Sequence, residues 1–207
     1  MRTLLFSLSA LILLTGCATK QERLQKEQVQ ARAKANVSKP EFQSVDMYAD
    51  FGVEKWQGIR AVDTIVVHTA NSVEGDPYEP KNVYNIFKKY KVSPHYMIGR
   101  DGTVYKMVDE NDLAHHAGKS RMQDGRESVN AFPIGIELIN SKTDYPTNAQ
   151  YIALAKLIDD IKTRHKIEHI VGHKDIAPER KSDPWNFDFD RLTILLTNQQ
   201  HAKDTSK

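Results

Sequence analysis

The sequence predicts an α/β fold with a central mixed β-sheet flanked by α-helices, and three observations support this prediction. Short apolar runs of strand length recur along the chain. Two of them flank residues 99–102, where an Asp-Gly pair is a strong signal for a β-hairpin. Amphipathic segments with helical spacing lie between the other runs. A hairpin combined with interleaved helices indicates a mixed sheet with helices packed on it.

Five segments are expected to form strands. Residues 64–68 are rich in β-branched side chains and bounded by polar residues, which favours a buried strand over a helix. Residues 96–98 and 104–107 are the hairpin strands and should pair antiparallel. Residues 134–139 and 169–171 are two further apolar runs of strand length.

Three helices are expected between and after these strands. The first has the spacing i, i+3, i+4 and i+7, at Val83, Ile86, Phe87 and Tyr90. The second repeats this stripe over a longer stretch, at Tyr151, Leu154, Ala155, Ile158, Ile161 and His165. It should begin after Pro146, with Thr147 or Asn148 as its N-cap. A closing helix is expected around residues 189–196.

Composition limits the number of domains and excludes several classes of protein. The 207 residues fit one globular domain plus a short additional segment. The 29 Lys and Arg residues are interspersed with 27 Asp and Glu residues, so nucleic acid is not an expected partner. The single Cys excludes a disulfide framework, a Cys-based zinc finger and a CxxC redox site. A transition metal would therefore need His and carboxylate ligands.

The N-terminus has the pattern of a signal peptide that is removed. Arg2 precedes an apolar run over residues 4–14, which is shorter than the ~20 residues of a membrane-spanning helix. The motif L-T-G-C that ends at Cys17 resembles a bacterial lipobox, which implies that residues 1–16 are cleaved and that Cys17 is lipidated. The residue after Cys17 is Ala18 and not Asp. By analogy with lipoprotein sorting in Gram-negative bacteria, the lack of Asp at this position implies an outer membrane lipoprotein that faces the periplasm.

The rest of the chain divides into a tether and a domain. Residues 17–44 are rich in Lys, Gln, Glu and Ala, and their apolar side chains are too sparse to build a core. We expect this segment to be a polar tether that starts at the lipidated Cys. Residues 45–205 have the length of one folded domain.

Ionisable groups gather in residues 172–184, a segment without helical or strand periodicity. A predicted strand leads into His173, and Asp183 stands before Pro184, which favours an extended backbone. Together with His68 at the end of the first strand, these residues offer two imidazoles and one carboxylate. Such a trio matches a catalytic zinc site, which has three protein ligands and one open position. An exposed charged loop is the alternative, and the residues by themselves leave both open.

Five sequence segments bear on this choice. They are V-V-H-T at 66–69, S-P-H-Y-M-I-G-R-D-G at 93–102, H-H-A-G at 115–118, I-G-I-E-L at 134–138 and G-H-K-D-I-A-P-E-R-K-S-D-P at 172–184. In order and spacing they resemble the zinc-dependent N-acetylmuramoyl-L-alanine amidases of the amidase-2 family, the AmpD type. The resemblance implies that residues 45–205 are a catalytic domain for peptidoglycan or muropeptides. It implies cleavage of the amide bond between N-acetylmuramic acid (MurNAc) and L-Ala. No protein partner is implied.

The same resemblance implies one zinc ion per chain on His68, His173 and Asp183, and catalytic roles for Glu137 and Lys181. Glu137 interrupts an apolar strand, and a buried acid is costly unless it has a task or a partner. Its implied task is to take a proton from the attacking water and pass it to the leaving nitrogen. Lys181 would face the oxyanion. The alternatives are a solvent-facing acid at a strand edge and a solvated loop lysine.

Further residues concern substrate binding. His116 and Asn130 match family positions that could contact substrate, and Lys91 stands where related enzymes often carry a basic residue that meets a peptide carboxylate. The sequence departs from the family at Thr69, where Asn is frequent, and at Ser128, which replaces a basic residue. The preferred stem peptide and glycan form therefore stay open.

Two functions other than hydrolysis are possible with this sequence. The main rival is a non-catalytic peptidoglycan-binding lipoprotein of the same fold, but such relatives lose a zinc ligand, and all three are present here. A structural lipoprotein that tethers envelope layers would not explain the segment 172–184. The sequence thus favours the enzyme.

Overall fold

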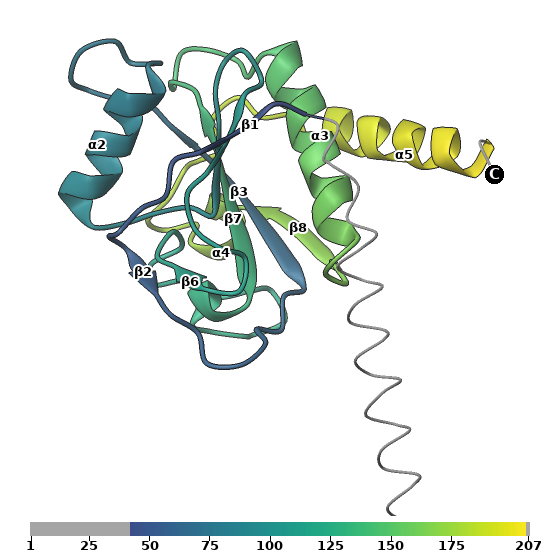
Figure 1. Cartoon of the computed structure of the whole chain (residues 1–207), viewed down its shortest axis with the longest axis horizontal. Helices are drawn as coiled ribbons and strands as arrows, with labels where there is room; N and C mark the ends of the chain where they lie inside the picture. The colour runs from purple at the N-terminus through teal and green to yellow at the C-terminus, as the bar shows by residue number, and fades with distance from the viewer. Residues whose placement is uncertain (1–41, 206–207) are drawn as a thin grey trace, which may run out of the picture. The chain divides into compact units, whose positions relative to one another are not determined.

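A six-stranded mixed β-sheet runs through the part of the chain that the structure, a computed structural model, describes, which is residues 42–205 (Figure 1). The strand order is β1-β5-β4-β7-β3-β8, and β2 and β6 form a separate two-stranded sheet. Helices pack on both sides of the large sheet, so the predicted fold class is confirmed. The expected signal peptide, Cys17 and nearly all of the expected tether lie outside the described residues.

The elements have the following bounds. The strands are β1 (Ser44–Asp46), β2 (Val53–Glu54), β3 (Thr64–Ala70), β4 (Tyr96–Ile98), β5 (Val104–Lys106), β6 (Leu113–Ala114), β7 (Pro133–Ile139) and β8 (His169–Gly172). The helices are α2 (Pro80–Tyr90), α3 (Asn148–Lys162), α4 (His173–Ile176) and α5 (Phe189–Thr205), with the 3₁₀ helix η1 (Val129–Ala131).

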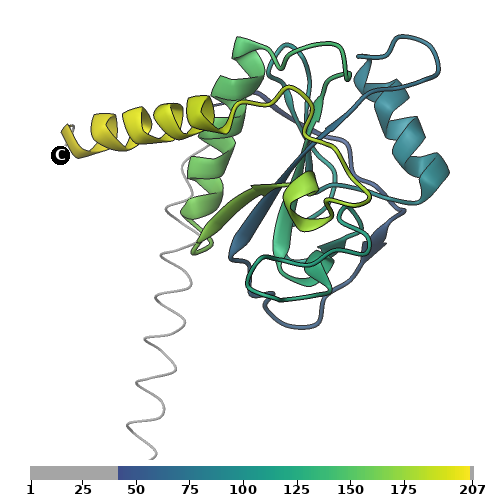
Figure 2. The ribbon, with the colours of Figure 1, turned by 180° about the vertical axis from the view of Figure 1, so that it is seen from behind.

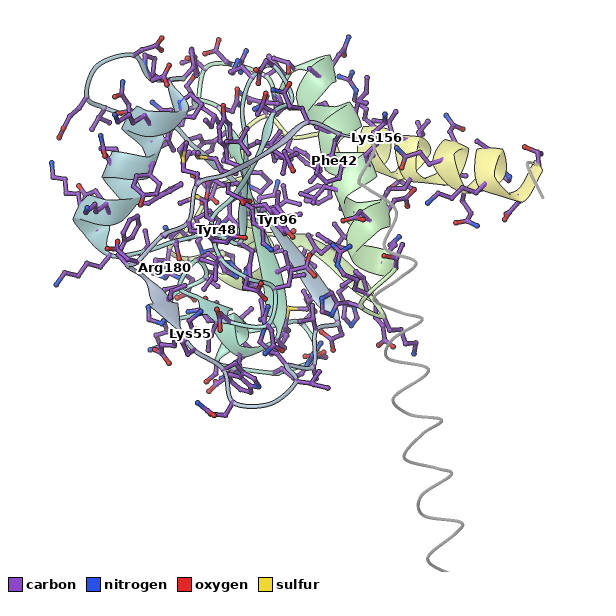
Figure 3. All side chains as sticks on the ribbon, in the orientation of Figure 1. Phe42, Tyr48, Lys55, Tyr96, Lys156 and Arg180 are labelled. Atoms are coloured by element: carbon purple, nitrogen blue, oxygen red, sulfur yellow. The ribbon has the colours of Figure 1, made fainter. Side chains whose placement is uncertain are left out.

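The sheet combines parallel and antiparallel pairs as the sequence predicts. Strands β4, β7, β3 and β8 run parallel, whereas β5 returns antiparallel to β4 through the expected hairpin. All five predicted strands are present. Strands β1, β2 and β6 were not predicted, because they have only two or three residues and, unlike β4 and β5, no hairpin signal beside them. Strand β1 begins at Ser44, and Phe42 packs against the core beside α3 (Figure 3). The folded domain thus starts slightly before the expected boundary at residue 45.

Alternation along β3 and β7 separates a packing face from a functional face. Ile65 and Val67 of β3 join the core cluster that contains α3, as do the alternate residues Ile134, Ile136 and Leu138 of β7. Successive strand side chains point to opposite faces. His68 and Glu137 therefore lie on the other face, where α2 and α4 pack (Figure 1).

The helices confirm most of the predicted details and correct two. Thr147 caps α3: its hydroxyl accepts the backbone N–H of Gln150 at 3.1 Å, and the Gln150 side chain accepts the backbone N–H of Thr147 at 3.0 Å. His165 was expected in the stripe of this helix, which is wrong, because α3 ends at Lys162. Tyr90 was expected in the apolar stripe of α2 but is 66% exposed, since it stands in the last turn.

The last helix is longer than predicted. Helix α5 projects from the body of the domain (Figure 2), and Leu192 in its first turns is buried in the core. Among residues 42–205, no helix is long and apolar enough to cross a membrane.

Candidate metal centre

Three neighbouring parallel strands bring the predicted site residues to one level. His68 on β3 stands directly opposite Glu137 on β7. On the other side of β3, Val67 pairs with Gly172, so the next residue, His173, emerges beside His68 as the first residue of α4. Gly172 lets Pro184 approach the end of β8, because a Cβ at Gly172 would lie 2.7 Å from the ring of Pro184. The carboxyl ends of parallel strands are the usual place for a functional site in such sheets.

His68, His173 and Asp183 converge on one point. His68 Nδ1 lies 3.0 Å from His173 Nδ1, and Asp183 Oδ2 lies 3.3 Å and 3.1 Å from these two atoms. All three residues are buried. A tetrahedral zinc ion with bonds of about 2.0–2.1 Å holds its ligand atoms roughly 3.4 Å apart. The three donor atoms are therefore spaced to hold one zinc ion without a cysteine.

The charge states of these groups also suit a metal. Burial lowers the pKa of His68 to about 4, against the opposing hydrogen bond with Asp183. Burial alone would raise the pKa of Asp183, but the hydrogen bonds with His173 and His68 outweigh it and hold this pKa well below its usual range. A neutral imidazole and an ionised carboxylate are the forms that bind zinc.

Glu137 and Lys181 face the same small cavity as the trio. The cavity has a volume of about 260 Å³, and its polar lining includes His68, His116, Glu137, His173, Lys181 and Asp183. Burial raises the pKa of Glu137 well above its ordinary value, the charge of Asp183 raises it further, and Lys181 opposes the shift. A raised pKa makes a carboxylate a stronger proton acceptor, which suits a group that takes up a proton and later returns it. Lys181 brings a positive charge to the same space.

The three residues expected to bind substrate have different locations. His116 lines the cavity, but its Nδ1 lies 3.0 Å from His68 Nε2. The side-chain oxygen of Asn130 accepts two backbone N–H groups, from His116 at 3.2 Å and Ala117 at 2.8 Å. Lys91 ends α2 in the left-handed conformation and is exposed, next to Val92, which lines the cavity.

One further cavity adjoins the metal centre at His173 and Lys181, and a larger cavity adjoins that one. A cavity of about 310 Å³ includes Asn130 and Lys181 and shares Gly118 and Arg180 with a cavity of about 700 Å³. Ser128, where the family carries a basic residue, lines the larger one. Arg180, labelled in Figure 3, spans the boundary between the two cavities.

Sequence reasoning gave no role to several residues that build the site. Thr69, noted only as a departure, is buried, and its hydroxyl accepts the backbone N–H of Trp185 at 2.8 Å, which fixes the chain after Asp183. His95 is fully buried, and its Nδ1 accepts the backbone N–H of Gly135 at 3.0 Å. The only sequence signal for this contact is Gly135 itself, because a glycine inside a strand often marks a place where another group approaches the backbone closely.

Comparison with known proteins identifies the family of this chain. The family model Amidase_2, described as N-acetylmuramoyl-L-alanine amidase, matches residues 58–186. The chain belongs to this family. The match includes His68, Glu137, His173, Lys181 and Asp183.

Individual proteins are similar to this chain in sequence and in structure. The chain is 42% identical over 118 residues to the 1,6-anhydro-N-acetylmuramyl-L-alanine amidase AmpD of Citrobacter freundii, a match that covers 56% of this chain and 63% of the relative. It thus spans less than two thirds of that relative. A crystal structure of a selenomethionine AmpD derivative superposes with a TM-score of 0.61 at 32% identity, over 77% of this chain and 97% of that one.

A second solved structure contains a ligand. It is the amidase AmiD from E. coli in complex with the substrate anhydro-N-acetylmuramic acid-L-Ala-D-γ-Glu-L-Lys. It superposes with a TM-score of 0.59 at 28% identity and covers 67% of this chain and 58% of that one.

Proposed function

We propose that this chain is a zinc-dependent N-acetylmuramoyl-L-alanine amidase, which hydrolyses the amide bond between MurNAc and L-Ala in peptidoglycan or muropeptides. The observation that carries the proposal is the convergence of His68, His173 and Asp183 within 3.3 Å of one another, in a cavity that Glu137 and Lys181 also line. Membership of the Amidase_2 family supports the same reaction.

Each residue has a separate task in this reaction. His68, His173 and Asp183 would hold the zinc ion, which supplies Lewis acidity toward the amide carbonyl and makes a nearby water more acidic. A carboxylate oxygen of Glu137 accepts the proton of the attacking water and then delivers it to the departing nitrogen of L-Ala. The raised pKa of Glu137 supports this role, because a higher pKa makes the carboxylate a stronger acceptor for the proton that it later delivers. The ammonium group of Lys181 stabilises the negative charge that develops on the carbonyl oxygen.

The substrate class follows from the reaction and from the relatives. The AmiD complex contains an anhydro-MurNAc tripeptide, and the name of the AmpD relative specifies the 1,6-anhydro form. We therefore include 1,6-anhydro-MurNAc peptides among the proposed substrates, together with intact peptidoglycan. The cavities beside the metal centre offer room for a stem peptide beyond L-Ala.

The location of the protein is a further part of the proposal. Signal cleavage and lipidation of Cys17 would anchor the chain to the outer membrane, facing the periplasm, where peptidoglycan lies. One acyl chain gives only marginal membrane binding, so stable anchoring needs the several chains of a mature lipoprotein. Cys17→Ala should move the protein from the membrane fraction to the soluble fraction. Unchanged fractionation would reject the lipid anchor.

The test of the activity uses the full-length chain in detergent with two substrates. Purified sacculi and a soluble anhydro-MurNAc tripeptide are digested, and the products are identified by mass spectrometry. We expect free peptides that begin with L-Ala, loss of activity with a chelator and recovery with zinc. Products cut within the peptide or between sugars would contradict the assignment. Binding without any product would favour the non-catalytic peptidoglycan-binding lipoprotein.

A further inference from the structure

Both histidines of the metal centre have a second ring nitrogen, and two consecutive residues contact these nitrogens. His68 Nε2 lies 3.0 Å from Nδ1 of His116. His173 Nε2 lies 3.1 Å from the backbone carbonyl oxygen of Ala117. If Nδ1 of each ligand histidine faces the metal, each Nε2 carries a hydrogen and donates it, to His116 Nδ1 and to Ala117 O. Such bonds fix the orientation of a metal-binding imidazole.

Asn130 holds this pair of residues in place. Its Oδ1 accepts the backbone N–H groups of both His116 and Ala117, at 3.2 Å and 2.8 Å. The same Ala117 carbonyl also accepts a hydrogen bond from the Arg180 guanidinium at 2.8 Å. One amide oxygen thus positions both groups that contact the ligand imidazoles.

The strand β7 is shaped to receive the His116 ring. Gly135 lies against it so closely that a Cβ on Gly135 would stand 2.4 Å from Cγ of His116. The neighbours of Gly135 in β7, Ile134 and Ile136, are buried and apolar, and Gly in a strand costs stability. The His95 ring accepts the backbone N–H of Gly135 on the same stretch of strand. Glycine at position 135 is therefore explained by the His116 imidazole, which occupies the space that a side chain would need.

The imidazole of His116 lowers the stability of the fold in a way that an apolar side chain at this position would not. Its Nε2 is buried and has no hydrogen-bond partner among residues 42–205. A leucine would fill similar space without an unpaired polar atom, and unpaired buried polar groups destabilise proteins. An imidazole is thus expected at this position for what its other nitrogen, Nδ1, does.

We propose that His116 and Ala117, held by Asn130, form a clamp that orients both zinc-binding imidazoles, so that His116 and Asn130 are positioning residues for the metal. This inference rests on the proposed zinc site. It also predicts that zinc affinity, measured without any substrate, depends on two residues that are not ligands.

The experiment measures the zinc dissociation constant of the metal-free full-length chain by competition with a chromogenic chelator. His116→Leu and Asn130→Leu should each weaken zinc binding about 10- to 100-fold. Two conservative variants should restore it. In His116→Asn, the amide oxygen can stand where Nδ1 stands, and in Asn130→Asp, a carboxylate oxygen can accept the same two N–H groups. His115→Leu is the matched control, because that neighbouring histidine contacts Glu54 at the surface and should bind zinc as the wild type does.

Folding is checked separately by thermal unfolding of the metal-free proteins. Gly135→Ala should lower the unfolding temperature strongly beside His116 but much less in the His116→Ala background, because the truncation removes the clash. Leu variants that bind zinc like the wild type would overturn the clamp, as would a failure of Asn and Asp to restore binding in variants that fold. A wild-type chain that binds no zinc would overturn the proposed function as well, and the two failures are thereby told apart.

Discussion

Glu110 and Glu137 are buried to nearly the same extent, 8% and 6% exposed, yet their surroundings are opposite. The Glu110 carboxylate accepts hydrogen bonds from the Tyr96 hydroxyl at 2.6 Å, from the Arg164 guanidinium at 2.8 Å and 3.0 Å, and from His165 Nε2 at 2.8 Å. Burial alone would raise the pKa of Glu110, but these bonds outweigh it and hold the pKa well below its usual range. Tyr96 is labelled in Figure 3.

Within the described residues 42–205, no such set of donors surrounds the Glu137 carboxyl group. Burial raises its pKa well above the ordinary value, the nearby Asp183 raises it further, and only the charge of Lys181 acts in the opposite direction. The comparison teaches that burial of an acid does not by itself indicate function. Glu110 is saturated with donors and stabilises the fold, whereas Glu137 is left with a perturbed pKa beside a cavity, which is typical of a group that transfers protons.

The largest expected effect tests the catalytic half of this comparison. Glu137→Gln should lower kcat by about 10²- to 10⁴-fold, because the amide keeps the shape of the side chain but cannot carry the proton. KM and zinc content should change little. Kinetics on a soluble MurNAc peptide and metal analysis measure both. Near-native kcat would remove Glu137 from the mechanism.

The next effect concerns the charge opposite Glu137. Lys181→Met keeps the length of the side chain and removes the ammonium group, so kcat should fall by about 10²- to 10³-fold. Zinc should again be retained. A change confined to KM, with kcat preserved, would instead make Lys181 a contact for the bound substrate.

The structural half of the comparison predicts a loss of stability without a loss of activity. Glu110→Gln leaves Arg164 and His165 in place without their shared carboxylate, and removing one partner of a buried ion pair costs about 3 kcal/mol. Urea unfolding measures this loss. The zinc content and kcat of the folded protein should equal those of the wild type, and a large drop in either would connect Glu110 to the site.

The two acids should also respond to pH in opposite directions in the metal-free protein. The pKa of Glu110 is depressed on folding, so its contribution to stability is present above the unfolded value of about 4.3 and is lost as the pH falls below it. The pKa of Glu137 is raised, so its contribution is present below about 4.3 and is lost as the pH rises. Unfolding free energies at several pH values, compared with those of Glu110→Gln and Glu137→Gln, measure these small effects. If both substitutions changed the pH dependence of the unfolding free energy in the same direction, the opposite pKa shifts assigned to Glu110 and Glu137 would be contradicted.

The sequence was sufficient for the elements whose pattern is local. The β-branched run of β3, the Asp-Gly hairpin and the Thr147 cap are set by neighbouring residues, and all three are confirmed. The short strand β1 was not predicted, because its pairing with β5 depends on residues about 60 positions away.

The candidate site divides in the same way. His173 and Asp183 could be selected because they stand in one distinctive segment, and the structure brings both to His68. The position of His116 beside His68 could not be predicted, because it depends on how a loop lies against Gly135. Contacts between segments far apart in the chain leave no periodic pattern in the sequence.

The central claim is that one zinc ion binds to His68, His173 and Asp183, and anomalous diffraction at the zinc edge tests it most directly. Crystals of the zinc-loaded protein should show one strong peak in the domain, within bonding distance of His68 Nδ1, His173 Nδ1 and Asp183 Oδ2, about 2.0–2.2 Å. No peak there, or a peak bound by other residues, would contradict the metal centre and the mechanism built on it.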